Sequence, residues 1–157
     1  SNGIGYTFQI TSIFINLTVY ENVALAIRKD SSNGEENSVS EVLSKVGLLD
    51  RIGQRSGDLS YGHQRLLELA MGMAQKPKLL ILDEPTQGLS DSEIENFKKL
   101  IKDISSSTTI LLIEHNMDVV MSIADNISVL HFGEIIADGD KETIQNDPIV
   151  QKAYLGD

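Results

Sequence analysis

Hydrophobic and polar positions alternate along this chain in two kinds of pattern. Residues 79–82 (Leu-Leu-Ile-Leu) form an unbroken apolar run between Pro77 and Pro85, and residues 109–113 form a second one. Short apolar runs of this kind predict strands that are buried in a parallel sheet. Between them, residues 92–104 carry apolar side chains at helical spacing. The order strand, helix, strand predicts a parallel pair joined by a crossover helix.

The remaining pattern predicts a set of helices and a terminal hairpin. Apolar residues at helical spacing predict helices over residues 18–28, 38–46, 116–124, 140–145 and 148–154, and another that starts after Ser60 and ends before Pro77. Asn16 or Thr18 suits the N-cap of the first helix. Residues 4–8 and 127–132 predict strands, and the latter leads through a turn at Gly133-Glu134 to a returning strand at 135–137.

Composition limits the architecture and the chemistry. The 157 residues have room for one ordinary domain, and their 41% apolar content is enough for a core. Since only 5% of the residues are aromatic, this core must consist mainly of Leu, Ile and Val. The sequence has no Cys, which excludes disulfides and thiolate metal sites.

The net charge of −10 narrows the classes of partner. It argues against a dedicated nucleic-acid binder, whose surface is usually basic, and against unaided adhesion to an anionic membrane. No apolar run reaches the length of a membrane span, and no secretory signal is visible. We therefore expect any membrane role to depend on a partner.

Acidic side chains follow the two predicted parallel strands. Asp83 and Glu84 come directly after the first, and Glu114 and His115 directly after the second. The carboxyl ends of parallel strands share one edge of the sheet, where open α/β sheets bind ligands. There, one carboxylate can hold Mg²⁺ and the next can orient or deprotonate an attacking water. The alternatives are a solvated acidic turn and a histidine with a purely structural hydrogen bond.

Three further segments carry candidate chemistry. Leu59-Ser60-Tyr61-Gly62 starts a helix whose free N–H groups suit an anion, although an ordinary capped helix has the same features. Gly88-Leu89-Ser90-Asp91 has the residues of a turn followed by an N-cap. Gln9 follows a predicted strand, where a simple polar cap is the alternative interpretation.

In this order and at these spacings, the segments resemble the ATPase subunit of an ABC transporter along essentially the whole chain. The resemblance is closest to the branched-chain amino-acid importer group, through the LSYG form of the signature, the stretch LLIEH at 111–115 and the ending AYLG at 153–156. It implies an α/β, P-loop-NTPase-like ABC ATPase fold with a parallel-sheet core and a helical subdomain. The expected parts are a helical signature subdomain of about 10–76 and an α/β core made of 3–9 and 77–157.

The resemblance also implies roles for single residues. Glu84 and His115 would be catalytic, and Asp83 and Gln9 would bind Mg²⁺ and ATP. The signature residues Leu59, Ser60, Tyr61 and Gly62 would contact the ATP of the opposite subunit, and Gly88, Leu89, Ser90 and Asp91 would form the D-loop at the dimer interface. The implied partners are a second ATPase subunit and transmembrane permease subunits, at the cytoplasmic face of the cell membrane. Neither nucleic-acid binding nor direct membrane insertion is expected.

One part of the family pattern does not occur in the 157 residues. The P-loop string G-x-x-x-x-G-K-[ST] is absent, and in the family it precedes the glutamine that Gln9 matches. We therefore expect the chain to be the C-terminal, larger part of an ATPase domain. Alone, it should lack useful ATPase activity, and its open sheet edge should favour self-association.

Other functions remain open at this point. The chain could be a non-catalytic regulatory half-domain, or part of the ATPase of a lipid or lipopolysaccharide exporter. A DNA-maintenance ATPase of the same superfamily is a weaker alternative, because residues 9–60 contain no heptad repeat. The sequence does not name the cargo, since the ATPase subunits of such transporters do not contact it.

Overall fold

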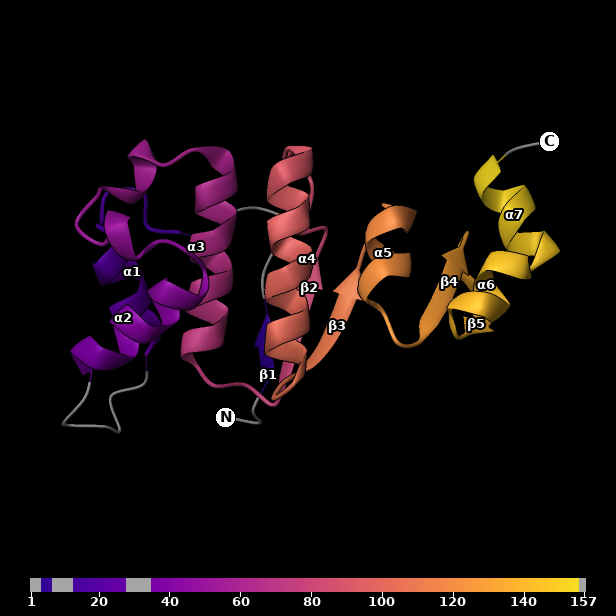
Figure 1. Cartoon of the computed structure of the whole chain (residues 1–157), viewed down its shortest axis with the longest axis horizontal. Coiled ribbons are helices and arrows are strands. Elements are labelled where there is room, and N and C mark those ends of the chain that lie inside the picture. The colour runs from indigo at the N-terminus through magenta and orange to yellow at the C-terminus, as the bar shows by residue number, and fades with distance from the viewer. Residues whose placement is uncertain (1–3, 7–12, 28–34, 156–157) are drawn as a thin grey trace. The chain divides into compact units, whose positions relative to one another are not determined.

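The computed structural model describes residues 4–6, 13–27 and 35–155, and the chain divides into two compact units, 1–115 and 116–157. The first unit contains, in chain order, β1 (Ile4–Tyr6), α1 (Val19–Ala26), α2 (Glu35–Lys45), α3 (Tyr61–Ala74), β2 (Leu79–Asp83), α4 (Asp91–Ser105) and β3 (Thr109–Ile113) (Figure 1). Two short 3-10 helices, Leu49–Arg51 and Ser56–Asp58, connect α2 to α3. No helix in the described ranges is long and apolar enough to cross a membrane.

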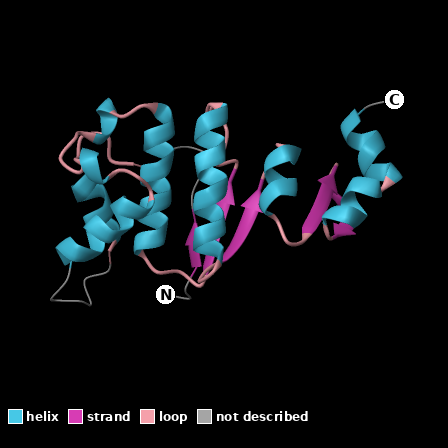
Figure 2. Cartoon of the chain, viewed as in Figure 1, coloured by secondary structure: helices cyan, strands magenta, loops and turns pink. Residues whose placement is uncertain are grey.

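The sheet of the first unit has the predicted parallel strands. Its order is β1-β2-β3, and both pairs are parallel (Figure 2). Leu80 and Leu82 of the central strand are buried, as expected. The prediction that β3 is buried was wrong, because Leu111 and Ile113 are 50% and 46% exposed. Within the described residues β3 pairs only with β2, so it is an edge strand and alternate side chains face outward.

Helices α1, α2 and α3 pack around an aliphatic core of their own. Its fully buried members are Val19, Val23, Val39, Leu43, Leu48, Leu67 and Ala70. Thr18 caps α1 in a capping box with Glu21, as one of the two sequence alternatives predicted. Helix α2 begins at Glu35, three residues before the predicted start at 38. The core therefore forms without aromatic residues among its buried members, in agreement with the composition.

A buried amide holds the segment that leads into α1. Asn22 is fully buried, and its Oδ1 accepts a hydrogen bond from the Phe14 N–H at 2.8 Å. Its Nδ2 lies 3.1 Å from the Phe14 carbonyl oxygen, 2.9 Å from that of Thr18 and 2.9 Å from Oγ of Ser56. This one side chain therefore joins the entry segment, the first turn of α1 and the 3-10 helix before the signature.

The second unit consists of α5 (Met117–Ile123), the hairpin of β4 (Ile127–His131) and β5 (Glu134–Gly139), α6 (Lys141–Asn146) and α7 (Pro148–Leu155). The two strands are antiparallel, and Ile127, Val129, Ile144 and Val150 form the core. The turn was predicted at Gly133-Glu134 but lies at Phe132-Gly133, where φ is +46° and +84°. A two-residue hairpin turn with two positive φ angles has the twist that suits its flanking strands.

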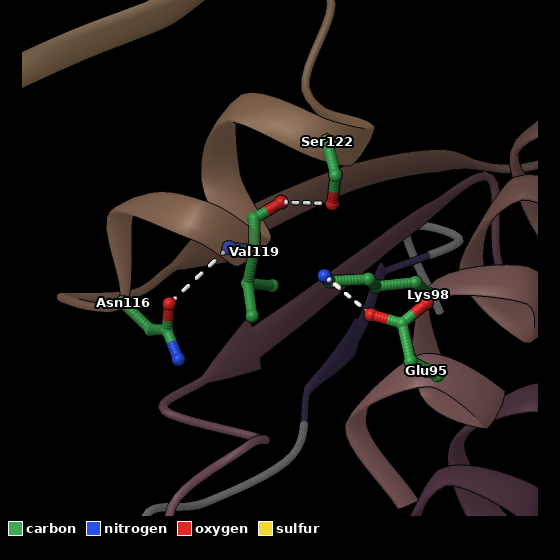
Figure 3. A network of polar contacts seen from close by, with 5 residues as sticks. All are labelled: Glu95, Lys98, Asn116, Val119 and Ser122. Carbon is green, nitrogen blue, oxygen red and sulfur yellow. Dashed lines mark hydrogen bonds and ion pairs between the residues drawn. The ribbon is translucent and has the colours of Figure 1, made fainter. Parts of the chain in front are cut away.

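Local polar contacts fix the ends and faces of single helices (Figure 3). In α5, Oδ1 of Asn116 accepts from the Val119 N–H at 3.3 Å, and the Ser122 hydroxyl donates to the Val119 carbonyl at 2.8 Å. In α4, Lys98 and Glu95 form an ion pair at 2.8 Å on the helix surface. Such an exposed pair adds about 0.3–0.5 kcal/mol, whereas the N-cap contributes about 1 kcal/mol.

The Asn22 network yields a stability prediction. Replacing Asn22 by Ala leaves the Phe14 N–H and buried carbonyl groups without their partner, so the free energy of unfolding should fall by about 2–4 kcal/mol. Urea unfolding followed by circular dichroism measures this. The matched control is Asn146→Ala, since Asn146 is exposed at the end of α6, and it should change stability by less than about 0.5 kcal/mol. Equal effects of the two substitutions would contradict the structural role of Asn22.

Candidate active site

The pairing of β2 with β3 brings the predicted acidic residues to one edge of the sheet. Asp83 is the last residue of β2 and lies opposite Ile113, the last residue of β3. The Glu84 N–H continues the ladder by donating to the Ile113 carbonyl at 2.9 Å. The residues that follow the two strands, Glu84 and Glu114-His115, therefore leave the sheet side by side. This agrees with the co-location expected from the strand order.

Glu84 has an unusual backbone conformation. Its φ is +46°, in the left-handed region that costs a non-glycine residue about 1–2 kcal/mol. The conformation is held from both sides, because the Glu84 N–H is bonded to β3 and the Glu84 carbonyl accepts from the Gln87 N–H at 3.2 Å. Strain of this kind is found where a side chain must point in a direction that ordinary backbone does not allow.

The carboxylate of Glu84 faces His115. Oε1 of Glu84 lies 3.5 Å from Nδ1 of His115, and the two side chains are 27% and 69% exposed. This distance is longer than a good hydrogen bond, and such an exposed pair contributes little to stability. Both groups are partly exposed, so solvent or a ligand can reach them.

Glu114 connects the two turns, and the sequence interpretation gave it no role. Its Oε1 accepts from the Thr86 N–H at 3.0 Å and also from the Thr86 hydroxyl, and Thr86 is only 6% exposed. Its Oε2 accepts from the His115 N–H at 3.1 Å. In the sequence, only the position of Glu114 directly before His115 could have indicated a role for it, because its partner Thr86 is distant in the sequence.

The signature segment forms the predicted N-terminus of α3. Ser60 is the N-cap, and its Oγ accepts from the His63 N–H at 3.3 Å and lies 2.8 Å from Nδ1 of the same residue. His63 thus takes part in the cap through its ring, at the position where the usual signature has Gln. Leu59 is buried, whereas the ring of Tyr61 is partly exposed.

Within the same unit, the signature segment lies against the predicted D-loop. A Cβ atom placed on Gly88 would lie 2.9 Å from Cε1 of Tyr61, and φ of Gly88 is +76°. A Cβ atom on Gly62 would lie 2.0 Å from Oε1 of Glu93. A side chain at either position would therefore displace a neighbouring side chain of the same chain, Glu93 at Gly62 and Tyr61 at Gly88.

Glu93 is fixed by the start of α4. Its carboxylate accepts from the Ser90 N–H at 2.8 Å and from the Ser90 hydroxyl at 2.7 Å, and the backbone hydrogen bond is the main reason why the pKa of Glu93 lies below its ordinary value. Asp91 is the first residue of α4, and the Leu89 N–H donates to the Thr86 carbonyl at 3.2 Å. Ser90-x-x-Glu93 is a capping-box pattern, so the sequence contained the signal for Glu93.

A buried ion pair on α3 lies beside the end of β2. Arg65 and Glu68 are 6% and 5% exposed and 3.0 Å apart, and Nε of Arg65 donates to the Tyr61 hydroxyl at 3.1 Å. Together with Leu82 and Asp83, the pair lines a cavity of about 20 Å³. The sequence interpretation missed both residues, although charges three positions apart on a helix commonly pair.

Of the two residues predicted to bind Mg²⁺, only Asp83 lies in the part of the chain that the structure describes. Gln9, the other predicted ligand, lies outside the described residues. Among the residues that the structure describes, no three His, Asp or Glu side chains converge as a metal site. Nucleotide-bound Mg²⁺ commonly takes one or two carboxylates and completes its octahedron with phosphate oxygens and water, and the Asp83 carboxylate is a ligand of that kind.

Comparison with known families identifies the class of protein. The ABC transporter family profile matches residues 1–87, and a profile named branched-chain amino acid ATP-binding cassette transporter matches residues 134–157. The chain belongs to the ABC transporter family of ATP-binding proteins, and within it to the branched-chain amino acid type.

Individual relatives agree with this assignment. The high-affinity branched-chain amino acid transport ATP-binding protein LivG of Escherichia coli is 36% identical over 99% of this chain and 68% of LivG, and BraF of Pseudomonas aeruginosa is 37% identical over the same shares. The lipopolysaccharide export system ATP-binding protein LptB of Haemophilus influenzae is 35% identical over 99% of this chain and 66% of LptB.

Solved structures confirm the predicted fold. The ADP conformation of MJ1267, an ATP-binding cassette of an ABC transporter, has a TM-score of 0.82 at 27% identity, over 99% of this chain and 69% of that one. The α/β ABC ATPase fold predicted from the motifs is therefore correct.

The contact between Gly62 and Glu93 yields a prediction about stability. Gly62→Ala should lower the free energy of unfolding by about 1 kcal/mol, because the new methyl group displaces Glu93 from Ser90 and removes the capping box. In a Glu93→Ala background the same substitution should be neutral or stabilising by up to about 1 kcal/mol, because alanine is the better helix residue. Urea unfolding of the four proteins in this cycle measures the difference. Identical effects of Gly62→Ala in both backgrounds would disprove the contact.

Proposed function

We propose that this chain contributes the water-activating and signature parts of an ATP-hydrolysing site. The observation that carries the proposal is the meeting of Asp83, Glu84 and His115 at the carboxyl edge of β2 and β3. An acid that can hold Mg²⁺, a second acid that can orient water and a histidine that can donate to a phosphate are groups that suit hydrolysis of a phosphoanhydride. Membership of the ABC transporter family supports the same chemistry.

The proposed roles follow from position. Asp83 ends β2 and takes part in holding Mg²⁺, which when bound neutralises charge on the phosphates. Glu84 leaves the sheet one residue later, and its strained backbone directs the carboxylate toward His115, where it orients and deprotonates the attacking water. His115 donates a hydrogen bond to the terminal phosphate. Gln9 is proposed to reach the same ion and water.

The signature acts on a second nucleotide in this proposal. Ser60 and Gly62 offer the N-terminus of α3 to the terminal phosphate of the ATP held by the opposite subunit. Gly88, Leu89, Ser90 and Asp91 precede or begin α4 and form the D-loop between the two subunits. Leu59 and Tyr61 belong to the same proposed contact with that ATP; Leu59 is buried, and the exposed ring of Tyr61 packs beside Gly88. The phosphate-cradling P-loop is not among these 157 residues, so we expect this chain alone to hydrolyse no ATP.

The proposed cargo is a branched-chain amino acid. Overall identity does not separate this class from lipopolysaccharide export, because LivG and LptB are almost equally identical to the chain. The match of residues 134–157 to the branched-chain profile favours branched-chain amino acid transport. The partners are then a second ATPase subunit and transmembrane permease subunits, and the helical subdomain of about 10–76 contacts the permease. The location that follows is the cytoplasmic face of the cell membrane.

Glu84→Gln tests the catalytic proposal in the complete ATPase that contains this chain. Hydrolysis should slow by about 10²–10⁴-fold, because an amide cannot take a proton from water, while ATP binding stays within about 2-fold of the parent. Phosphate release and binding of a fluorescent ATP analogue measure the two quantities. The control is Glu95→Gln, since Glu95 lies exposed on α4 and forms only a surface ion pair. Hydrolysis at the parental rate by Glu84→Gln would remove Glu84 from the mechanism.

A non-catalytic regulatory half-domain is the alternative that the sequence interpretation left open. Sequencing the coding DNA upstream of Gly3 separates the two functions. An in-frame G-x-x-x-x-G-K-[ST] several tens of codons before Gln9 supports the ATPase. A start codon close to Gly3 without that string supports the regulatory function.

A further inference from the structure

We propose that Glu114 is a positioning residue that sets the orientation of both Glu84 and His115. The inference rests on the proposed function, because it concerns how the hydrolytic groups are held. Glu114 occupies the single position between β3 and His115, and its two carboxylate oxygens are used by different parts of the site.

One oxygen holds the turn that follows Glu84. Oε1 accepts from both the N–H and the hydroxyl of Thr86, two residues beyond Glu84, and Thr86 is buried. An ionised acceptor makes such hydrogen bonds roughly twice as strong as neutral ones. The turn is thereby fixed at Thr86, while the Glu84 N–H is fixed to Ile113. Glu84 lies between these two anchors, which explains how its positive φ is maintained.

The other oxygen holds the segment that carries His115. Oε2 accepts from the His115 N–H at 3.1 Å. The His115 side chain is 69% exposed, so packing does little to orient it. The hydrogen bond from its backbone N–H to Glu114 holds the segment that carries it. The Glu114 carboxylate thus connects the turn after Glu84, the proposed general base, to the backbone of His115. His115 is the residue proposed to donate a hydrogen bond to the phosphate. The 3.5 Å separation of Glu84 and His115 is set through this tie.

The effect should appear in turnover and not in nucleotide affinity. Glu114 itself faces Thr86 and the backbone, so it makes no proposed contact with ATP. Misplacing a reacting group by about 1 Å can cost about 10²-fold in rate, and loosening the turn should cost part of that. We therefore expect Glu114→Ala to lower kcat by about 10-fold or more and to change KM for ATP by less than about 2-fold.

The test uses the complete ATPase with Glu114→Ala, Glu114→Gln and Thr86→Val, and with Glu134→Ala as a control at an exposed strand residue. Glu114→Gln should lose less activity than Glu114→Ala, since its amide oxygen still accepts from Thr86 but its NH₂ group cannot accept from His115. Thr86→Val should also lower kcat, and the double variant Glu114→Ala with Thr86→Val should be little worse than Glu114→Ala alone. Glu134→Ala should have parental kcat and KM.

The outcomes separate the inference from the proposed function. Parental kcat in Glu114→Ala, or fully additive losses in the double variant, would overturn the role of Glu114 while leaving ATP hydrolysis intact. No hydrolysis by the unsubstituted protein would overturn the proposed function and this inference with it. If Glu114→Ala does not fold, Glu114→Gln and Thr86→Val decide, because both keep the size of the side chain; unchanged kcat in both would count against the proposal.

Discussion

The parallel pairing of β2 with β3 is the constraint on which the site depends. With Asp83 opposite Ile113, the next residues of both strands leave the sheet at the same level. A shift of one residue would turn every side chain of one strand to the other face and separate Glu84 from His115. The buried side chains of Leu80 and Leu82 oppose such a shift, since it would expose them. The chemistry at the edge therefore rests on aliphatic packing inside the sheet.

A second constraint joins the signature to the D-loop within one chain. Gly62 lies against the Glu93 carboxylate, and Tyr61 lies against Gly88, so the two segments pack against each other. The buried pair of Arg65 and Glu68 on the same helix lines a small cavity together with Leu82 and Asp83 at the end of β2. The signature segment and the segment that follows Asp83 and Glu84 are therefore neighbours within one chain.

The elements that depend on local pattern were predicted well from the sequence. The strand at 79–82, the amphipathic α4 and the Ser60 cap follow from periodicity and capping chemistry, which are local. The burial of β3 was wrong, because an apolar run shows that a strand can be buried but not whether a neighbour covers it. The hairpin turn was misplaced by one residue, since positive φ at Phe132 is unfavourable for an aromatic residue and only the pairing of the strands imposes it.

The residues that orient the site were the least predictable, and the reason is physical. Asp83, Glu84 and His115 could be recognised in the sequence, because they are chemically reactive residue types at the ends of predicted strands. Glu114 and Thr86 are 28 positions apart, and a hydrogen bond between such distant positions produces no periodic pattern in the sequence. The same holds for Gly62 and Glu93, where only folding shows why a side chain is excluded. Catalytic groups can therefore be proposed from one sequence, whereas the groups that hold them in place need the fold, because their partners are brought together only by it.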